Sequence, residues 1–226
     1  ENDNLSVTDF AVKVLSNSTE PQKGSSPHPK KKPSAYSLDI LYEDEVMLVC
    51  NKPSGLVVHG GTGHEQTQSL LDLILAHSKG SCRSTPSLVH RLDKETSGVL
   101  LLAKDKQILR RLNEALRRHN ISKRYIAVCH GMPRPRKGTI KLGMTKHSNR
   151  RDGMKMVVDQ QGKPSESSYA VEESRNGISR IAVDLHTGRT HQIRVHLAHI
   201  RCPIIGDTRY GNADADRSLF ETKQAQ

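Results

Sequence analysis

The most apolar stretch of the chain, Val99-Leu100-Leu101-Leu102-Ala103, limits the folds that are open to it. An unbroken apolar run of this length suits a strand that is covered on both faces, because a strand with one face in water alternates apolar and polar residues. The chain has 226 residues, of which 34% are hydrophobic, so it can bury such a strand in a core of ordinary size. We therefore expect a globular protein built around this run.

Amphipathic helices are predicted before and after this run. Thr67 and Asp105 are suitable N-caps for them, because their side chains can accept hydrogen bonds from the free backbone amides of a first helical turn. A third helix is predicted after Thr190, which would cap it. The apolar faces have helical spacing and comprise Leu70, Leu71, Ile74 and Leu75, then Ile108, Leu112, Ala115 and Leu116, then Ile193, Leu197 and Ile200.

Alternating apolar and polar residues predict further strands. A hairpin is predicted over residues 38–50, with its turn at the acidic pair Glu43-Asp44. The segment 131–153 is rich in glycine and basic residues and is expected to be an exposed excursion. Further strands are predicted at residues 124–129, 154–158, 167–171 and 178–185. This order predicts an α+β fold with a largely antiparallel sheet and no internal repeat.

The charge of the chain is strongly basic. There are 35 Lys and Arg residues against 24 Asp and Glu, which gives a formal net charge of +11. Such an excess favours a polyanionic partner, since cations that neutralise phosphates release condensed counterions. Charge alone is equally consistent with a merely basic surface. Residues 1–36 are expected to be a linker or tail, because the segment 27–33 mixes prolines with mutually repelling lysines.

Several classes of protein are disfavoured by the sequence. No stretch approaches the roughly 18 apolar residues of a membrane span, and the first residues lack the apolar core of a secretory signal. No serine lies in a nucleophile elbow, and the glycines at residues 60–63 lack the lysine and hydroxyl of a nucleotide phosphate loop. The four cysteines are dispersed and are expected to be reduced thiols: Cys50, Cys82, Cys129 and Cys202.

A metal site is also not expected. His186, His191, His196 and His199 lie near one another in the sequence, but their spacing does not match a zinc-binding helix with two histidines four residues apart. No nearby carboxylate or thiolate completes a set of ligands.

Two polar segments are candidates for a functional site. The segment His90-Arg91-Leu92-Asp93-Lys94-Glu95-Thr96-Ser97-Gly98 precedes the buried strand, where a loop on a rigid element often carries function. An aspartate in such a turn more often only caps backbone amides, so the segment alone favours a structural role. The second segment, residues 187–196, is a glycine turn that enters a helix with basic residues at its N-terminal end. Phosphate binding and a solvated basic face explain it equally well.

Four longer motifs, which include both segments, favour the functional interpretation over the structural one. They are LYEDEVMLVCNKPSGLVVHGG, HRLDKETSGVLLLAKD, KRYIAVCHG and TGRTHQIRVHLAHIRCPIIGDTRYG. In order and spacing they resemble the RluA-type family of RNA pseudouridine synthases, over about residues 38–211. Within that family, the strings VHGG and GKPSE are most similar to the ribosomal large-subunit synthase C branch.

The resemblance implies a fold and an activity. The fold is a mixed, mostly antiparallel central sheet with flanking helices and a catalytic cleft, formed by residues 37–226 without their C-terminal end. The activity breaks the bond between uracil and ribose, rotates the base and rejoins it through carbon, without a cofactor. The expected partner is structured RNA, with large-subunit ribosomal RNA first and transfer RNA as the alternative. A cytoplasmic monomer without a membrane partner is expected.

The resemblance also implies the site residues. Asp93 matches the catalytic aspartate of the family, Tyr125 its active-site tyrosine and Arg194 the basic residue that pairs with the aspartate. Arg91 matches an arginine that enters the RNA stack where the target base leaves. His90, Arg189 and His191 are the further expected RNA contacts, Leu92 and Ile193 the expected apolar walls of the pocket, and Thr96, Ser97 and Gly98 complete the loop.

Physical chemistry is consistent with this set. A uridine stacked in folded RNA must be flipped out, which costs a few kcal/mol that protein contacts must offset. Arg91 can fill the gap and Tyr125 can stack on the flipped base. Burial raises the pKa of a carboxyl group, whereas a nearby guanidinium favours the charged form, so Arg194 is the candidate counter-charge of Asp93.

Two other kinds of protein are weighed against the synthase. A non-catalytic RNA-binding or ribosome-assembly factor would keep the basic surface but lose the carboxylate site. A glycosidase would need a second carboxylate to activate water, and none is evident in the motifs. Two departures from the family are expected: only a tail precedes residue 38, where relatives carry an S4 RNA-binding domain, and no pattern for a further strand and helix follows the GDTRYG motif.

Overall fold

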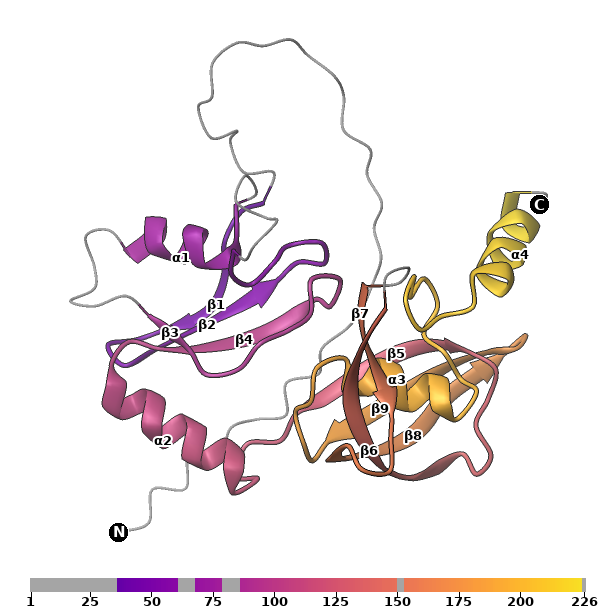
Figure 1. Cartoon of the computed structure of the whole chain (residues 1–226). Coiled ribbons are helices and arrows are strands. Elements are labelled where there is room, and N and C mark those ends of the chain that lie inside the picture. The colour runs from indigo at the N-terminus through magenta and orange to yellow at the C-terminus, as the bar shows by residue number, and fades with distance from the viewer. Residues whose placement is uncertain (1–35, 61–67, 79–85, 150–152, 225–226) are drawn as a thin grey trace. The chain divides into compact units, whose positions relative to one another are not determined.

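The computed structural model describes residues 36–60, 68–78, 86–149 and 153–224, which belong to two compact units (Figure 1). We call the described residues up to Ile121 the amino-terminal unit and those from Ser122 onward the carboxy-terminal unit. The predicted tail, apart from Tyr36, and the predicted cap Thr67 lie outside the described residues.

The amino-terminal unit contains a four-stranded antiparallel sheet with two helices. The strands, in spatial order, are β1 (Asp39–Glu43), β2 (Met47–Lys52), β4 (Gly98–Ala103) and β3 (Ser87–Leu88), and the helices are α1 (Leu70–Ser78) and α2 (Lys106–Arg117). Strand β4 lies inside the sheet, and its Leu100 and Leu102 are fully buried. The apolar run therefore forms the predicted strand, but only one face is fully buried, since Val99 and Leu101 on the other face are partly buried.

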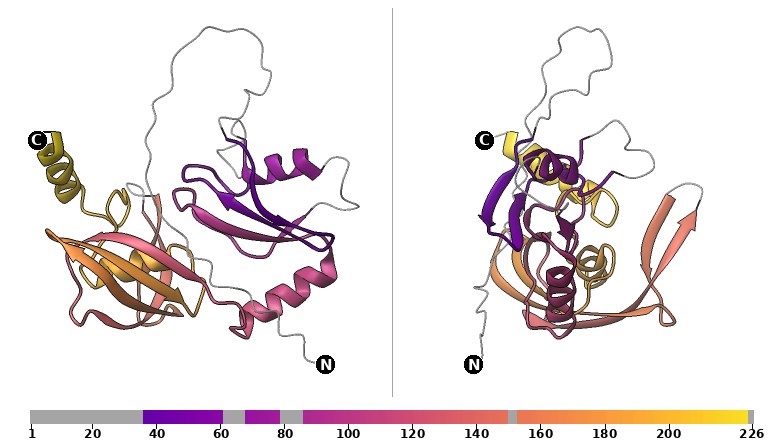
Figure 2. Two further views of the ribbon diagram at one scale, coloured as in Figure 1. Left: turned by 180° about the vertical axis from the view of Figure 1, so that it is seen from behind. Right: turned by 90° about the vertical axis from the view of Figure 1, so that its left-hand side faces the viewer.

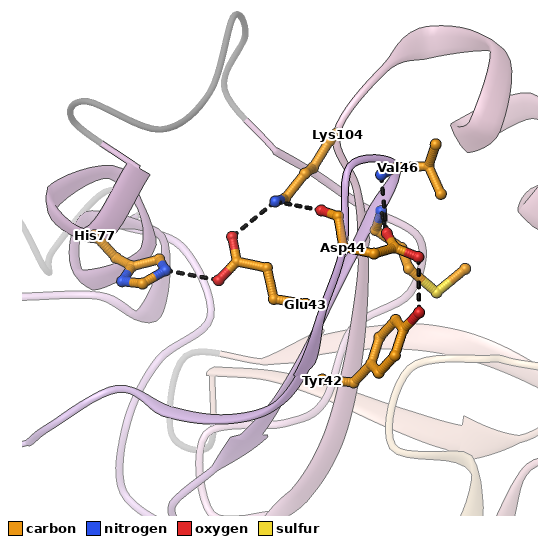
Figure 3. A network of polar contacts seen from close by, with 7 residues as sticks. Tyr42, Glu43, Asp44, Val46, His77 and Lys104 are labelled. Atoms are coloured by element: carbon orange, nitrogen blue, oxygen red, sulfur yellow. Dashed lines mark hydrogen bonds and ion pairs between the residues drawn. The ribbon is translucent and has the colours of Figure 1, made fainter.

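Short polar contacts fix the turns of this unit. Asp44 Oδ1 accepts hydrogen bonds from the amides of Val46 (2.8 Å) and Met47 (2.7 Å), which closes the turn between β1 and β2. Figure 3 shows Glu43, the last residue of β1, accepting a hydrogen bond from Lys104 Nζ (2.7 Å) and lying 2.8 Å from His77 Nε2 of α1. Glu43, from the acidic pair that interrupts the hydrophobic pattern, thus connects the hairpin to α1 and to Lys104, the residue after β4.

The caps of the first two helices can be compared with their predictions. Asp105 accepts from the amides of Gln107 and Ile108, which confirms it as the N-cap of α2. Helix α1 begins at Leu70, and Ser69 exchanges hydrogen bonds with Asp72 in its first turn, the reciprocal pattern of a capping box.

The carboxy-terminal unit contains a five-stranded antiparallel sheet that curves around one helix (Figure 2). In spatial order the strands are β5 (Arg124–His130), β9 (Ile178–Leu185), β8 (Lys163–Arg175), β6 (Lys137–Asn149) and β7 (Gly153–Val158). The helices are α3 (Gln192–His199) and α4 (Ala213–Gln224). Leu197 of α3 packs in a core with Ile140, Ile181 and Val183 of the sheet. The predicted α+β fold with antiparallel pairing is confirmed, and the described strands form two sheets.

The prediction of an exposed excursion over residues 131–153 is wrong for most of that segment. Strand β6 pairs with both β7 and β8, and its Ile140 and Met144 are buried. Glycine concealed the strand pattern, but two glycines are needed for close packing here. A Cβ at Gly138 would lie 3.2 Å from the ring of Tyr169, and one at Gly143 would lie 2.1 Å from the carbonyl of Asp159.

Two predictions near the C-terminus are also wrong. Thr190 does not cap the third helix, because α3 begins at Gln192 after His191, whose backbone is left-handed (φ 56°) and whose side chain makes no capping bond. A helix does follow the GDTRYG motif: α4 begins after Asn212, whose Oδ1 accepts from the amide of Ala215 (3.1 Å). Its sequence, ADADRSLFETKQ, has too few apolar residues to show a clear helical face. Among the described residues, no helix is long and apolar enough to cross a membrane.

Candidate active site

Asp93 lies in a tight turn between β3 and β4 of the amino-terminal unit. The amide of Thr96 donates to the carbonyl of Asp93 (3.1 Å) and so closes the turn. Leu92 on one side is 5% exposed and belongs to the core, and Gly98 on the other has a φ of 126°, which favours glycine. Asp93 itself is half-buried. A buried anchor on each side therefore holds a partly accessible carboxylate.

Lys52, the last residue of β2, holds the same turn from beneath. Its ammonium group is 0% exposed and donates to three carbonyls, those of Pro53 (2.8 Å), Leu56 (2.8 Å) and Lys94 (2.9 Å). The amide of Gly55 donates to the same carbonyl of Lys94 (3.0 Å). All three donors of the lysine are thereby used, and they tie the segment after β2 to the residue next to Asp93.

Burial changes the acid–base behaviour of this lysine. Loss of water around the ammonium group lowers the pKa of Lys52 to about 8, against the opposing effect of the nearby carboxylates of Glu95 and Asp93. Lys52 lies in the first of the four motifs, but the sequence alone predicts no role for it.

The rest of the Asp93 segment has mixed exposure. Arg91 is exposed, as a residue that enters an RNA stack must be, and Leu92 is too deeply buried to present more than a small surface to a substrate. His90 Nε2 accepts from the amide of Leu101 in β4 (3.3 Å). His90 is therefore bonded to the backbone of the sheet, and its contact with RNA stays a prediction.

Tyr125 and Arg194 belong to the carboxy-terminal unit. Tyr125 is half-buried on β5, opposite Val183 of β9. The neighbouring Arg124 pairs with Asp184 on β9 through two hydrogen bonds, of 2.8 and 3.1 Å. Because successive residues of a strand point to opposite faces, this surface ion pair and the ring of Tyr125 lie on different sides of the sheet.

Arg194 lies on α3 and has a carboxylate partner that the sequence did not predict. Its Nε and Nη2 donate to Asp207 Oδ2 (2.7 Å) and Oδ1 (2.8 Å), and the side chain of Asp207 is 4% exposed. The guanidinium also lies over the ring of Tyr210, 5.0 Å from its centroid. Two residues of the GDTRYG motif thus surround Arg194.

Gln192 organises the glycine turn that precedes α3. This buried side chain donates to Glu166 O (2.9 Å) and Ser167 Oγ (2.8 Å), and it accepts from Thr187 Oγ1 (2.7 Å) and the amide of Arg189 (3.0 Å). The turn is therefore fixed to β8. The exposed Arg189 donates through Nε to the carbonyl of Pro164 (3.1 Å).

The histidines of this region have partners within the fold. His191 Nδ1 lies 2.8 Å from Tyr210 Oη, and His186 Nε2 lies 2.7 Å from Ser168 Oγ. His196 is fully buried, with Nε2 2.8 Å from Ser165 Oγ, and burial lowers its pKa to about 4. In the part of the chain that the structure describes, no group of three or more His, Cys, Asp or Glu residues could hold a metal ion.

The predicted site residues are divided between the two units. His90, Arg91, Leu92 and Asp93 belong to the amino-terminal unit, and Tyr125, Arg189, His191, Ile193 and Arg194 to the carboxy-terminal unit. Within the second unit, the structure brings His191 and Arg194 together around Tyr210, while Ile193 packs against the core. The pairing of Arg194 with Asp93 stays a prediction.

Lys52, Gln192, Asp207 and Tyr210 were not predicted, although each lies in one of the four motifs. The only signal in the sequence was their presence in those motifs, since the contacts of each depend on residues far away in the chain. Asp207, for example, bonds a residue thirteen positions earlier.

Comparisons with known proteins agree with the motifs. A family model described as RNA pseudouridylate synthase matches residues 46–199. "Ribosomal large subunit pseudouridine synthase C" of Haemophilus ducreyi is 41% identical over 180 residues, which cover 80% of this chain and 55% of that protein. Synthase D of Buchnera aphidicola is 42% identical over 180 residues, or 79% of this chain and 56% of that protein. Synthase C of Escherichia coli is 39% identical over 205 residues, or 88% and 61%.

Solved structures show the same relationship. The human protein named RNA Pseudouridylate Synthase Domain Containing 4 is 32% identical, with a TM-score of 0.63 over 77% of this chain and 69% of that one. Human RNA Pseudouridylate Synthase Domain Containing 1 is 26% identical, with a TM-score of 0.64 over 82% and 74%. The chain spans 55–61% of the length of the three bacterial relatives. By sequence and by fold, the chain belongs to the RNA pseudouridylate synthase family.

Proposed function

We propose that the chain isomerises uridine to pseudouridine in a structured RNA, with Asp93 as the catalytic carboxylate and without a cofactor. The turn of Asp93 carries the proposal, because a buried ammonium group, a core leucine and a strand-entry glycine fix a carboxylate that stays half-buried. A site held in this way is pre-organised for one reaction geometry.

The isomerisation places defined demands on the other residues. The uracil must leave the RNA stack, and the exposed Arg91 has the charge and length to replace it between neighbouring bases. Tyr125 offers a half-buried ring against which a flipped base can stack. Arg194 would favour the ionised form of Asp93. The reaction exchanges one glycosidic bond for another within the same nucleotide, so it requires neither an oxidant nor the net addition of water.

The proposed substrate is large-subunit ribosomal RNA. The bacterial relatives carry the names of ribosomal large-subunit synthases C and D and match this chain at nearly the same identity. Their names support ribosomal RNA over transfer RNA without choosing between the two kinds of synthase. A cytoplasmic protein that acts as a monomer on this RNA is part of the same proposal.

Asp93→Asn tests the function. We expect pseudouridine formation to fall at least about 1,000-fold, while RNA affinity stays within about threefold, because the change removes charge at nearly constant shape. Single-turnover assays should use unmodified transcripts of large-subunit ribosomal RNA and of transfer RNA, with pseudouridine detected by carbodiimide-dependent primer extension. Asp39→Asn is a matched control on the exposed strand β1.

Each outcome separates one alternative. Substantial turnover by Asp93→Asn would exclude Asp93 as the essential group. Free uracil among the products would identify a glycosidase, and RNA binding by the unmodified chain without any product would identify a non-catalytic factor. Product on transfer RNA alone would overturn the proposed substrate while leaving the reaction intact.

A further inference from the structure

We propose that Asp207 and Tyr210 are positioning residues for Arg194, which they hold in one orientation by fixing its guanidinium to strand β7. The inference rests on the proposed function, because it concerns the residue expected to set the charge of Asp93. All of the contacts that carry it lie within the carboxy-terminal unit.

Asp207 fixes one edge of the guanidinium. The two parallel hydrogen bonds from Nε and Nη2, of 2.7 and 2.8 Å, form a planar pair that restricts rotation of the arginine side chain. Asp207 bonds the edge formed by Nε and Nη2, so Nη1 points away from Asp207. A hydrogen bond from Nη1 to an acceptor would therefore have a defined direction.

Asp207 is itself held in place by backbone amides. Its Oδ1 accepts from the amides of Arg209 (2.9 Å) and Tyr210 (3.0 Å), in addition to the bond from Arg194. Burial acts to raise the pKa of this carboxyl group, but the hydrogen bonds from Arg194 and the two amides outweigh it and hold the pKa below the ordinary value. Asp207 is consequently an ionised and immobile partner at neutral pH.

Tyr210 fixes the face of the guanidinium and connects it to the sheet. Its ring lies beneath the Arg194 guanidinium, with 5.0 Å between ring centroid and Cζ. Its hydroxyl accepts a hydrogen bond from the amide of Met156 on β7 (2.9 Å) and lies 2.8 Å from His191 Nδ1. Arg209, from the same segment, donates to the carbonyl of Met154. The segment 207–210 is thereby attached to both β7 and the start of α3.

This arrangement is more than an arginine needs for burial alone. The side chain of Arg194 is 21% exposed, so water can solvate part of its charge. Solvation of the charge therefore does not require both Asp207 and Tyr210. A carboxylate against its edge and an aromatic ring against its face instead restrict its rotation and tilt. Such double restraint is what an arginine needs if its remaining edge must meet a reacting carboxylate or the substrate in one geometry.

The test is to loosen Arg194 without removing it. Asp207→Asn keeps the shape of the carboxylate but removes its charge, and Tyr210→Phe keeps the ring but removes the hydroxyl that bonds Met156 and His191. With unmodified large-subunit ribosomal RNA at saturation, we expect single-turnover rates to fall about 30-fold for Asp207→Asn and about fivefold for Tyr210→Phe, with RNA affinity within about threefold. Asp207→Glu should recover part of the rate.

A double-mutant cycle distinguishes positioning from general stabilisation. In an Arg194→Met background, Asp207→Asn should cause no further loss of rate, because there is no guanidinium left to orient. Asp214→Asn, an exposed aspartate of α4 that pairs with Arg217, is the matched control and should leave the rate unchanged. Undiminished rates in both Asp207→Asn and Tyr210→Phe, or additive losses in the cycle, would overturn the proposal.

A second measurement does not depend on turnover. The Nε–H of Arg194 should exchange slowly with solvent in the unmodified chain, as observed by nitrogen-15 NMR, and at least about tenfold faster in Asp207→Asn. If the wild-type chain forms no pseudouridine in any RNA, the proposed function fails. Slow exchange of the Arg194 Nε–H in the wild-type chain, and faster exchange in Asp207→Asn, would still show that Asp207 restrains Arg194. If Asp207→Asn does not fold, Tyr210→Phe remains as the decisive variant. Fast exchange in the unmodified chain would overturn the positioning role itself.

Discussion

Lys52 places an ammonium group out of contact with water directly beneath the turn that carries Asp93. A charge in that position has a desolvation cost, which its three hydrogen bonds to carbonyl groups offset. The same bonds hold the backbone next to the proposed catalytic carboxylate. A single side chain therefore connects the local geometry of β2 with that of the active-site turn.

Lys52→Met should separate activity from binding. The apolar side chain has similar length but removes the ammonium donor from the carbonyls of Pro53 and Leu56 and leaves that of Lys94 with the amide of Gly55, which we expect to destabilise the protein by about 1–3 kcal/mol. A displaced Asp93 turn should lower the single-turnover rate by about 100-fold. Denaturant titration and rate measurements check the two effects, with the exposed Lys106→Met as control. A wild-type rate in Lys52→Met would show that the turn keeps its geometry without the lysine.

The lowered pKa of Lys52 has a consequence for stability as pH rises. Its pKa is about 8 in the folded protein, against about 10.4 for an unperturbed lysine. Between these values the unfolded chain binds more protons than the folded one, so this group makes the folding free energy more favourable as pH increases. Below pH 8 Lys52 is protonated in both the folded and the unfolded protein, so its contribution to the free energy of unfolding does not change with pH. The stability of the unmodified chain relative to Lys52→Met should therefore rise between about pH 8 and 10.4. A pH-independent difference over that window would contradict the assignment.

At the scale of elements, close packing of strands depends on glycine. Gly162, just before β8, approaches the backbone of β6 so closely that a Cβ would lie 2.5 Å from Met144 N. Gly162→Ala should therefore destabilise the protein by about 1–3 kcal/mol, as overpacking does. Gly60→Ala is a matched control, since a Cβ there meets nothing within 4 Å. Thermal or denaturant unfolding measures both, and equal stability of the two variants would show that the loop can shift without cost.

The elements that the sequence predicted well are those whose signals are local. Asp105 caps α2 through contacts two and three residues away, and β9 was predicted with the bounds that the structure has, 178–185. Strand β6 was missed because glycines that serve packing against Tyr169 and Asp159 look, in sequence, like loop residues. Thr190 was favoured as a cap by its side chain alone, whereas the turn before α3 is set by Gln192 and its distant partners on β8.

The candidate site divides in the same way. The family motifs predict Asp93, Tyr125 and Arg194 as site residues, because a motif assigns residues by their position in the sequence. They did not reveal that Arg194 bonds Asp207 or that Lys52 bonds the carbonyl of Lys94, since both contacts exist only after the chain has folded. They also did not reveal that His90 bonds the backbone of the sheet at Leu101.

For the whole molecule, the net charge of +11 should govern the affinity for RNA. If binding neutralises about six phosphates, the logarithm of the association constant should fall with the logarithm of salt concentration with a slope of about −4. Filter binding or fluorescence anisotropy with an unmodified ribosomal RNA transcript, from 50 to about 300 mM salt, measures this slope. A slope near zero would mean that the basic residues do not contact phosphates.

Strand β7 lies at the edge of its sheet, where backbone groups that have no neighbouring strand can template pairing with another molecule. The contacts of Tyr210 with the amide of Met156 and of Arg209 with the carbonyl of Met154 occupy two of these groups. We therefore expect the segment that orients Arg194 also to reduce self-association through this edge. The double variant Arg209→Ala with Tyr210→Phe should aggregate at concentrations where the unmodified chain does not, by light scattering over a dilution series. Equal scattering from both proteins would mean that other features protect this edge.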